Sequence, residues 1–279
     1  MTSRRSNRWL AGGLVALAAG LAANTLLGPL VAGVITYPLS DPVTNQTLGL
    51  ETVSLLVVAP LSALAAVLVL RGNRAGPIAA IPPAGYAAYM FVQYIIGPQY
   101  VEYPPVIPFH LAMFVLSGIL LVLSWNRVRV EDLPTVSSRR RRIYSAVLVL
   151  LALFASFGYL FAVPRMLTGG TIPAEYIDDP SVYWTVFLLD LGVVVPITVA
   201  VSTSLLRGAV WARKALFGLV GWYALVTIAV LALFVSMLVH DDPNVTVGIV
   251  IALCIATFLI VAFTGWVYRP FLSQTSPSS

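Results

Sequence analysis

The amino-acid sequence predicts an all-α, polytopic integral membrane protein with eight transmembrane helices, arranged as two parallel four-helix repeats. The first observation behind this prediction is composition. Apolar residues make up 59% of the 279 residues and charged residues only 10%, and the mean hydropathy is +0.93. A soluble domain carries about 25% charged residues, so this chain lacks the charge to cover a core in water. A bilayer removes that requirement.

The second observation is a series of apolar stretches, each close to the roughly 20 residues that a helix needs to cross a bilayer. They cover residues 9–34, 52–70, 77–96, 107–125, 143–163, 182–206, 215–239 and 245–267. A short basic segment precedes the first stretch, as in a signal peptide. The apolar region of a signal has only about 7–15 residues, however, so we predict a helix that is retained.

The third observation is the distribution of charge. Fifteen of the 16 basic residues fall on one side of the predicted membrane, and only Arg165 falls on the other. Cytoplasmic loops are enriched in Lys and Arg, so we predict a multi-pass protein of the cell membrane with both termini in the cytoplasm. The net charge of +5 follows this topology and indicates no nucleic-acid partner. Arg139, Arg140, Arg141 and Arg142 can bind anionic lipids, or serve only to orient the second half.

Within the first span, small or short residues recur at every fourth position, which predicts a face for close packing against another helix. They are Gly12, Ala16, Gly20, Asn24 and Gly28. Asn24 can also form a hydrogen bond across such a contact, so it is a candidate site residue.

An outer loop is expected at residues 37–51, before the second span. In the third span, Tyr86 and Tyr89 lie on one face, and their hydroxyl groups need partners inside the membrane. These two tyrosines are expected either to bond between helices or to line a polar cavity.

The two halves of the chain, residues 1–136 and 137–279, resemble one another. A single constant offset in numbering aligns Val57, Val58, Pro60, Leu70, Arg71 and Gly72 with Val193, Val194, Pro196, Leu206, Arg207 and Gly208. Because each half holds an even number of predicted spans, the halves are expected to be parallel and related by an axis along the membrane normal.

The main candidate for a functional residue is Asp190, which lies well inside the sixth span. A carboxylate at the centre of a transmembrane helix costs about 2.5–3.5 kcal/mol on insertion scales, and it normally faces the bundle interior with a partner. Pro196 breaks the same helix. Glu51 corresponds to a position one turn further out, so the two acids are expected to face each other. If Asp190 is instead a structural lock, Arg165 or a tyrosine is its expected partner.

The outer connections are acidic and include two histidines near helix ends. The candidates on this face are His110, His240, Asp178, Asp179, Asp241 and Asp242. The acids can concentrate cations at an outer mouth, or they are only solvated loop residues. The histidines can ligate haem, or they are polar tips at the membrane interface.

Three functions follow from these residues. The first is a transporter of a small solute or ion, with a polar site around Asp190 between the two halves. The second is a non-catalytic partner or scaffold, in contact with another protein or a second copy of itself. The third is a haem or redox protein that uses His110 and His240. The chain lacks the sequence motifs of common hydrolases, nucleotide-binding and dinucleotide-binding enzymes and has a single cysteine, Cys254, so we expect no enzyme and no cofactor under the first two hypotheses.

Overall fold

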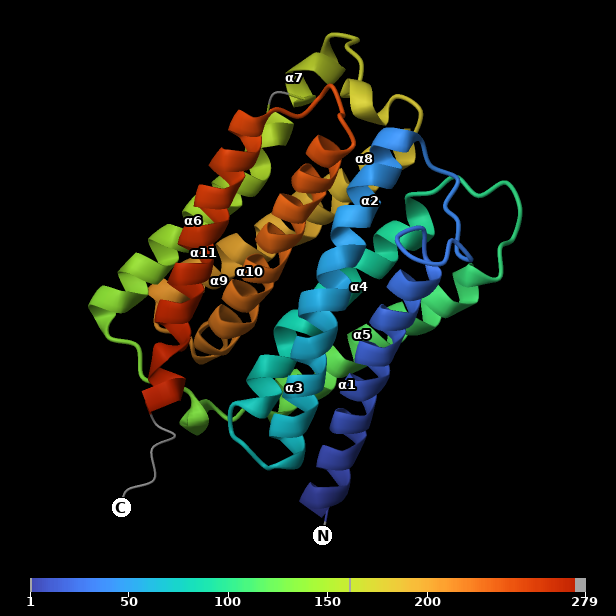
Figure 1. Ribbon diagram of the computed structural model, residues 1–279. Helices are drawn as coiled ribbons and strands as arrows, with labels where there is room; N and C mark the ends of the chain where they lie inside the picture. Colours follow the sequence, from blue (N-terminus) through green and yellow to red (C-terminus); the bar gives the residue numbers. More distant parts are fainter. Residues whose placement is uncertain (1, 161, 274–279) are drawn as a thin grey trace.

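The computed structural model describes residues 2–160 and 162–273, and its regular elements are helices (Figure 1). Seven helices or continuous helical runs are long and apolar enough to cross a membrane. These are Asn7–Leu27, Asp41–Leu70, Val106–Arg127, Ser138–Leu167, Pro180–Leu206, Val210–Val239 and Val247–Phe271. The chain is therefore a helical, multi-pass membrane protein, as its composition predicts.

Each half of the chain contains a helical run that is interrupted by a π-helical turn, followed by further long helices. The first half forms α1 (Thr2–Leu27), α2 (Asp41–Val53), the π-helix η1 (Ser54–Val58), α3 (Ala59–Leu70), α4 (Gly76–Ile96) and α5 (Val106–Arg127). After the 3-10 turn η2 (Val130–Asp132), the second half forms α6 (Ser138–Leu160), α7 (Ala162–Leu167), the 3-10 turn η3 (Ala174–Tyr176), α8 (Pro180–Leu189), the π-helix η4 (Asp190–Val194), α9 (Val195–Leu206), α10 (Val210–Val239) and α11 (Val247–Ser273).

The predicted third span, α4, is helical but is not among the seven runs that are long and apolar enough to cross a membrane. It has 21 residues and contains Pro82 and Pro83 in its interior. It packs against α3, α5, α8 and α10, and its buried positions include Tyr86 and Tyr94. A helix that is surrounded by protein does not need an apolar exterior, so hydropathy underestimates it.

The predicted outer loop at residues 37–51 is wrong, because α2 begins at Asp41 and runs without a break into η1 and α3. Pro42 occupies the first turn, where its missing N–H costs nothing. Asp41 is also favourable there, because a negative charge stabilises the N-terminus of a helix. The polar residues Gln46 and Glu51 lower the hydropathy of this segment, but both are buried. The helix packs against α10 instead of facing lipid.

The small-residue face predicted for α1 is only partly correct. Gly20, Asn24 and Gly28 are buried, whereas Gly12 and Ala16 are exposed. A spacing of four residues advances by about 40° beyond a full turn at 3.6 residues per turn. A stripe with this spacing therefore winds around the helix and leaves the contact face. The first helix also ends at Leu27, short of the predicted residue 34.

Each of the two proline-containing spans is continuous and has a π-helical turn before its proline. The amide of Ala59 donates to the carbonyl of Ser54, and the amide of Val195 donates to the carbonyl of Asp190. Proline lacks an N–H and clashes with the carbonyl four residues earlier. A single wider turn accommodates this loss without breaking the helix.

The two halves contact each other through four helices. The helix α2 of the first half packs against α10 of the second, α8 of the second half packs against α4 of the first, and α4 also packs against α10. Within the halves, α1 packs against α3 and α6 packs against α9. Figure 1 shows the resulting bundle, in which α6 and α11 lie on one side and α1 and α5 on the other.

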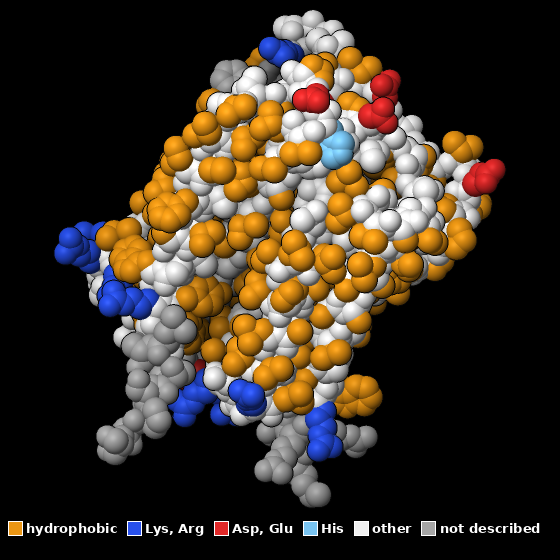
Figure 2. Space-filling model, in the orientation of Figure 1, with side chains coloured by type: hydrophobic (Ala, Val, Ile, Leu, Met, Phe, Trp, Pro, Cys, Tyr) orange, Lys and Arg blue, Asp and Glu red, His pale blue; other side chains and the backbone are white. Residues whose placement is uncertain are grey.

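The charged side chains lie mainly at the two ends of the bundle, and apolar side chains cover its flank (Figure 2). We call the end that holds Arg71, Arg127 and Arg213 the basic end, and the end that holds Glu102, Asp178 and Asp241 the acidic end.

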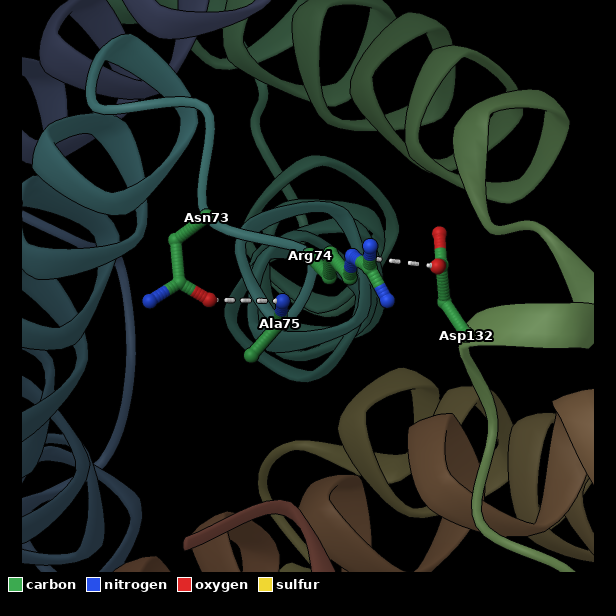
Figure 3. A network of polar contacts seen from close by, with 4 residues as sticks. All are labelled: Asn73, Arg74, Ala75 and Asp132. Carbon is green, nitrogen blue, oxygen red and sulfur yellow. Dashed lines mark hydrogen bonds and ion pairs between the residues drawn. The ribbon is translucent and has the colours of Figure 1, made fainter. Parts of the chain in front are cut away.

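At the basic end, a polar network joins two connections (Figure 3). Arg74 Nε lies 3.5 Å from Asp132 Oδ1, and Asn73 Oδ1 accepts a 2.9 Å hydrogen bond from the amide of Ala75. The ion pair ties the connection before α4 to η2. Because the side chain of Arg74 is 81% exposed, the pair contributes little to stability.

Candidate functional site

Asp190 is the first residue of η4 and joins three helices. The hydroxyl of Tyr89, on α4, donates a 2.7 Å hydrogen bond to Oδ1. The hydroxyl of Tyr159, near the end of α6, donates a 2.9 Å hydrogen bond to Oδ2. Ten residues separate Asp190 from the start of α8, so it lies about 15 Å along the helix from the acidic end. Both carboxylate oxygens thus accept bonds from phenols near the middle of the span.

A cavity of about 560 Å³ lies beside this carboxylate. Its volume falls in the range of small-molecule sites, about 300–1,000 Å³. Polar groups on its wall come from Gln46, Tyr89, Tyr159, Glu175, Tyr176, Tyr183, Asp190, Tyr223, Thr227, Asn244 and Thr257. Among the described residues that line it, none is Lys, Arg or His. The cavity is therefore mainly apolar and aromatic, with carboxyl groups at two positions, Asp190 and Glu175.

Most of the cavity wall belongs to the second half of the chain. Only Gln46 and Tyr89 come from the first half. A smaller cavity of about 120 Å³ lies between α2, α4, α8 and α10 and has Tyr86 on its wall. Gln46, Tyr89 and Tyr176 line both cavities, and the hydroxyl of Tyr176 donates a 3.0 Å hydrogen bond to Gln46 Oε1. The two hydrogen-bonded side chains therefore form part of the wall that the two cavities share.

Glu51 does not face Asp190 but belongs to a separate, largely buried cluster. Its Oε1 accepts hydrogen bonds from Asn24 Nδ2 at 3.3 Å and from the hydroxyl of Tyr37 at 3.1 Å. Glu51 and His110 are both 0% exposed. His110 Nε2 lies 2.8 Å from Asn24 Oδ1, and since Asn24 Nδ2 is already a donor, its oxygen accepts from the imidazole.

The Glu51 cluster is closely packed and includes stacked rings. The rings of Tyr37 and Tyr94 are stacked with centroids 5.4 Å apart, and Tyr94 lies 5.4 Å from the ring of His110. Burial and then the nearby Glu51 raise the pKa of Tyr37, so its phenol keeps its proton and remains a donor. Among the described residues, Glu51 Oε2 and His110 Nδ1 have no hydrogen-bond partner.

The two acids therefore differ in access to a ligand. Glu51 is enclosed by side chains of α1, α5 and the connection after α1, and Gly28 leaves room for its carboxylate: a Cβ there would lie 2.8 Å from Oε2. Asp190 is only partly buried and lines the larger cavity. Of the two carboxylates, Asp190 is the one that a ligand in the cavity can reach.

The other residues expected at the outer face serve different purposes. Asp179 is 4% exposed and accepts hydrogen bonds from Ser40, through its amide at 2.9 Å and its hydroxyl. Asp242 is 7% exposed and accepts from the amide of Asn244 at 2.9 Å. These two carboxylates therefore accept hydrogen bonds from connections at the acidic end of the bundle. Asp178 and Asp241 are exposed.

The predicted pairing of Arg165 with Asp190 is not present among the described residues. Arg165 is exposed on α7, and Asp190 is bonded to tyrosines instead. His110 and His240 form no common site, because His110 is buried against Asn24 and His240 is exposed and contacts the carbonyl of Ser236. His110 is thus not a polar tip at the interface. The described residues contain no group of three His, Cys, Asp or Glu side chains placed to hold a metal ion.

Sequence reasoning missed Tyr159 and Tyr37, which bond to the two buried acids. A tyrosine inside a predicted span is a signal that could have directed attention to Tyr159, since its hydroxyl needs a partner in lipid. Tyr37 lies in a connection and carries no such signal. Tyr86, a predicted candidate, bonds instead to Ser54 and to the carbonyl of Leu50, both at 3.4 Å.

The helices and the apolar flank define the protein as a helical, multi-pass membrane protein. No family model, curated protein or solved structure matches the chain. Its function is therefore inferred from the geometry of its own cavity and buried acids.

Proposed function

We propose that the protein moves a small cationic solute or a cation across the membrane through a site at Asp190. The observation that carries this proposal is a carboxylate, oriented by Tyr89 and Tyr159, on the wall of a 560 Å³ cavity about 15 Å from the end of its span. Intramembrane acids that face a cavity mark solute and ion pathways. The absence of basic side chains from the described cavity wall favours a positively charged solute.

The proposed architecture has eight spans in two parallel repeats, with α4 as the eighth. Support comes from the constant offset in numbering that aligns Pro60 with Pro196. The same offset aligns the first and last residues of η1 with those of η4, and the first and last residues of α3 with those of α9. The reciprocal packing of α2 on α10 and of α8 on α4 is the pattern that a two-fold axis between the halves produces.

We further propose that the basic end and both chain termini face the cytoplasm, in accordance with the positive-inside rule. The acidic end of the bundle then faces the outside of the cell. Arg139, Arg140 and Arg142, which are exposed at the start of α6, then lie at the level of anionic lipid heads.

The test is cation flux into vesicles that contain the purified protein, with Na⁺, K⁺, H⁺ and methylammonium as probes. We expect Asp190→Asn to abolish flux of the transported probe and Asp190→Glu to retain part of it. Asp178→Asn is the matched control, because Asp178 is exposed and lies outside the described cavity wall. Unchanged flux in a correctly folded Asp190→Asn protein contradicts the proposal.

A second candidate function is that of a non-catalytic membrane partner or a homo-oligomer. It is supported by α11, of which only 6% is buried over its most apolar window. The exposed apolar surface of α11 can be covered by lipid or by a helix of another protein chain. Co-purification of a stoichiometric partner, together with no flux of any of the four probes, would favour this function over transport.

A further inference from the structure

The cavity beside Asp190 reaches the apolar flank of the bundle between α6 and α11. Phe154 and Gly158 of α6 line the cavity and are also exposed at the surface, Phe154 by 53%. Leu253, Ala256 and Thr257 of α11 line the opposite side. An added Cβ at Gly158 would meet no atom within 4 Å. Exposed residues and a glycine without close neighbours on the cavity wall are what an opening between α6 and α11 would produce.

This opening lies in the half of the flank nearer the acidic end. Towards the basic end, α6 and α11 are closed against each other, since the ring of Tyr144 lies 5.8 Å from that of Phe263 and 5.1 Å from that of Trp266. Phe154 and Gly158 are in the second half of α6, and Leu253 and Ala256 are in the first half of α11. Both positions lie within helical runs that are long and apolar enough to cross a membrane, Ser138–Leu167 and Val247–Phe271.

The wall around Asp190 has the chemistry that binds an organic cation. The rings of Tyr89 and Trp222 lie 5.5 Å apart on the cavity wall, and Tyr159 bonds to the same carboxylate. Aromatic faces attract quaternary and protonated amines, most strongly where water is excluded. Leu151 and Val194 add apolar wall for a hydrocarbon tail.

We propose that the ligand of this cavity is a lipophilic organic cation that enters from the bilayer between α6 and α11 and places its charged head at Asp190. The inference rests on the proposed function, because it assigns the substrate class of the same site. It adds two features: the solute carries an apolar tail, and it arrives laterally through the lipid at Gly158 instead of from water.

The test uses three amphiphiles with the same brominated tail: 11-bromoundecyltrimethylammonium, 11-bromoundecanol and 11-bromoundecanoate. Bromine quenches tryptophan fluorescence on contact, and Trp222 lines the cavity while being only 9% exposed. The protein is placed in vesicles as a variant in which the other five tryptophans are replaced by Phe: Trp9, Trp125, Trp184, Trp211 and Trp266. Quenching is compared at equal membrane-bound concentrations of the three compounds.

We expect the ammonium compound to quench Trp222 at a concentration at least tenfold lower than the alcohol or the carboxylate. Asp190→Asn is expected to remove this tenfold preference, and Asp190→Glu to retain it. Gly158→Leu, which fills the opening, is expected to abolish quenching. The matched control is Gly12→Leu, because Gly12 is also an exposed helical glycine with no atom within 4 Å of an added Cβ.

Three results would overturn the inference: no quenching of Trp222 by the ammonium compound, equal quenching by all three compounds, or quenching that Gly158→Leu leaves unchanged. The outcome is distinguishable from that of the flux experiment. If methylammonium flux depends on Asp190 but the ammonium compound does not quench Trp222, the proposed transport function stands and the proposed lipophilic substrate is wrong. If the ammonium compound quenches Trp222 selectively but no cation flux is observed, the proposed binding site stands and the proposed transport function is wrong.

Discussion

Ser54 and Asp190 occupy equivalent places in the two proline-containing helices: each is the first residue of a five-residue π-helix. Their side chains have different partners. The hydroxyl of Ser54 donates back to the carbonyl of Leu50 at 3.0 Å, whereas the carboxylate of Asp190 accepts bonds from two other helices and lines the cavity. The same π-helical turn therefore carries a side chain that could bind a ligand in only one half of the chain.

The first prediction concerns the bond between Tyr159 and Asp190. We expect Tyr159→Phe to lower the free energy of unfolding by about 1–2 kcal/mol, since hydrogen bonds inside membranes are modest but those to a carboxylate are stronger. The same change in an Asp190→Asn background should cost less, because the carboxylate that strengthens the bond is gone. Thermal unfolding in detergent measures both. Tyr103→Phe is the control, since Tyr103 is 100% exposed; purely additive effects of the two changes would contradict the coupling.

The second prediction concerns Asn24, which bonds to Tyr37, Glu51 and His110. We expect Asn24→Leu to destabilise the protein by about 3 kcal/mol or more, because each buried polar group left unpaired costs about 1–3 kcal/mol. The comparison is Ser117→Ala.

Ser117 is as fully buried as Glu51, but its hydroxyl bonds to the carbonyl of Met113 in its own helix. We expect this control to cost under about 1 kcal/mol. Similar melting temperatures for the Asn24 and Ser117 variants would show that the cluster adds no stability.

The third prediction concerns the contact between α2 and α10. A Cβ at Gly49 would lie 2.6 Å from Leu233 Cα and closer still to the carbonyl of Ala232. Backbone atoms cannot move aside as a flexible side chain can, so we expect Gly49→Leu to prevent folding. Gly49→Ala should cost about 1–3 kcal/mol or more. The yield of monodisperse protein measures the first variant and thermal unfolding the second. Gly12→Leu should fold at normal yield, and an equal yield for Gly49→Leu would refute the close contact.

The fourth prediction concerns topology and includes the crossing of α4. Single cysteines are placed at Arg71, Val101, Ser137 and Thr171 in a Cys254→Ala background and treated with an impermeant thiol reagent in right-side-out vesicles. We expect labelling at Val101 and Thr171 only, because these residues are exposed at the acidic end and the other two at the basic end. If α4 did not cross, Arg71 and Val101 would be labelled from the same side.

Much of the fold could be predicted from the sequence, because the length of an apolar run is a local property. The last residues of α5, α9 and α10 lie within two residues of the predicted ends of their spans. The prediction failed for α2, where Gln46, Thr47 and Glu51 are polar and yet buried. Their partners come from other helices, and no local pattern reveals which helix will face them.

By itself, the sequence determined that the protein is helical and membrane-embedded, that Asp190 is a polar residue inside a span, and that one offset in numbering aligns the residues around Pro60 with those around Pro196. Only the tertiary structure decided that Tyr89 and Tyr159 hold Asp190, that Glu51 belongs with Asn24 and His110, and that a cavity lies beside Asp190. The physical reason is that backbone hydrogen bonds in a membrane helix form within one segment. The partners of a buried side chain depend instead on how separate helices pack together.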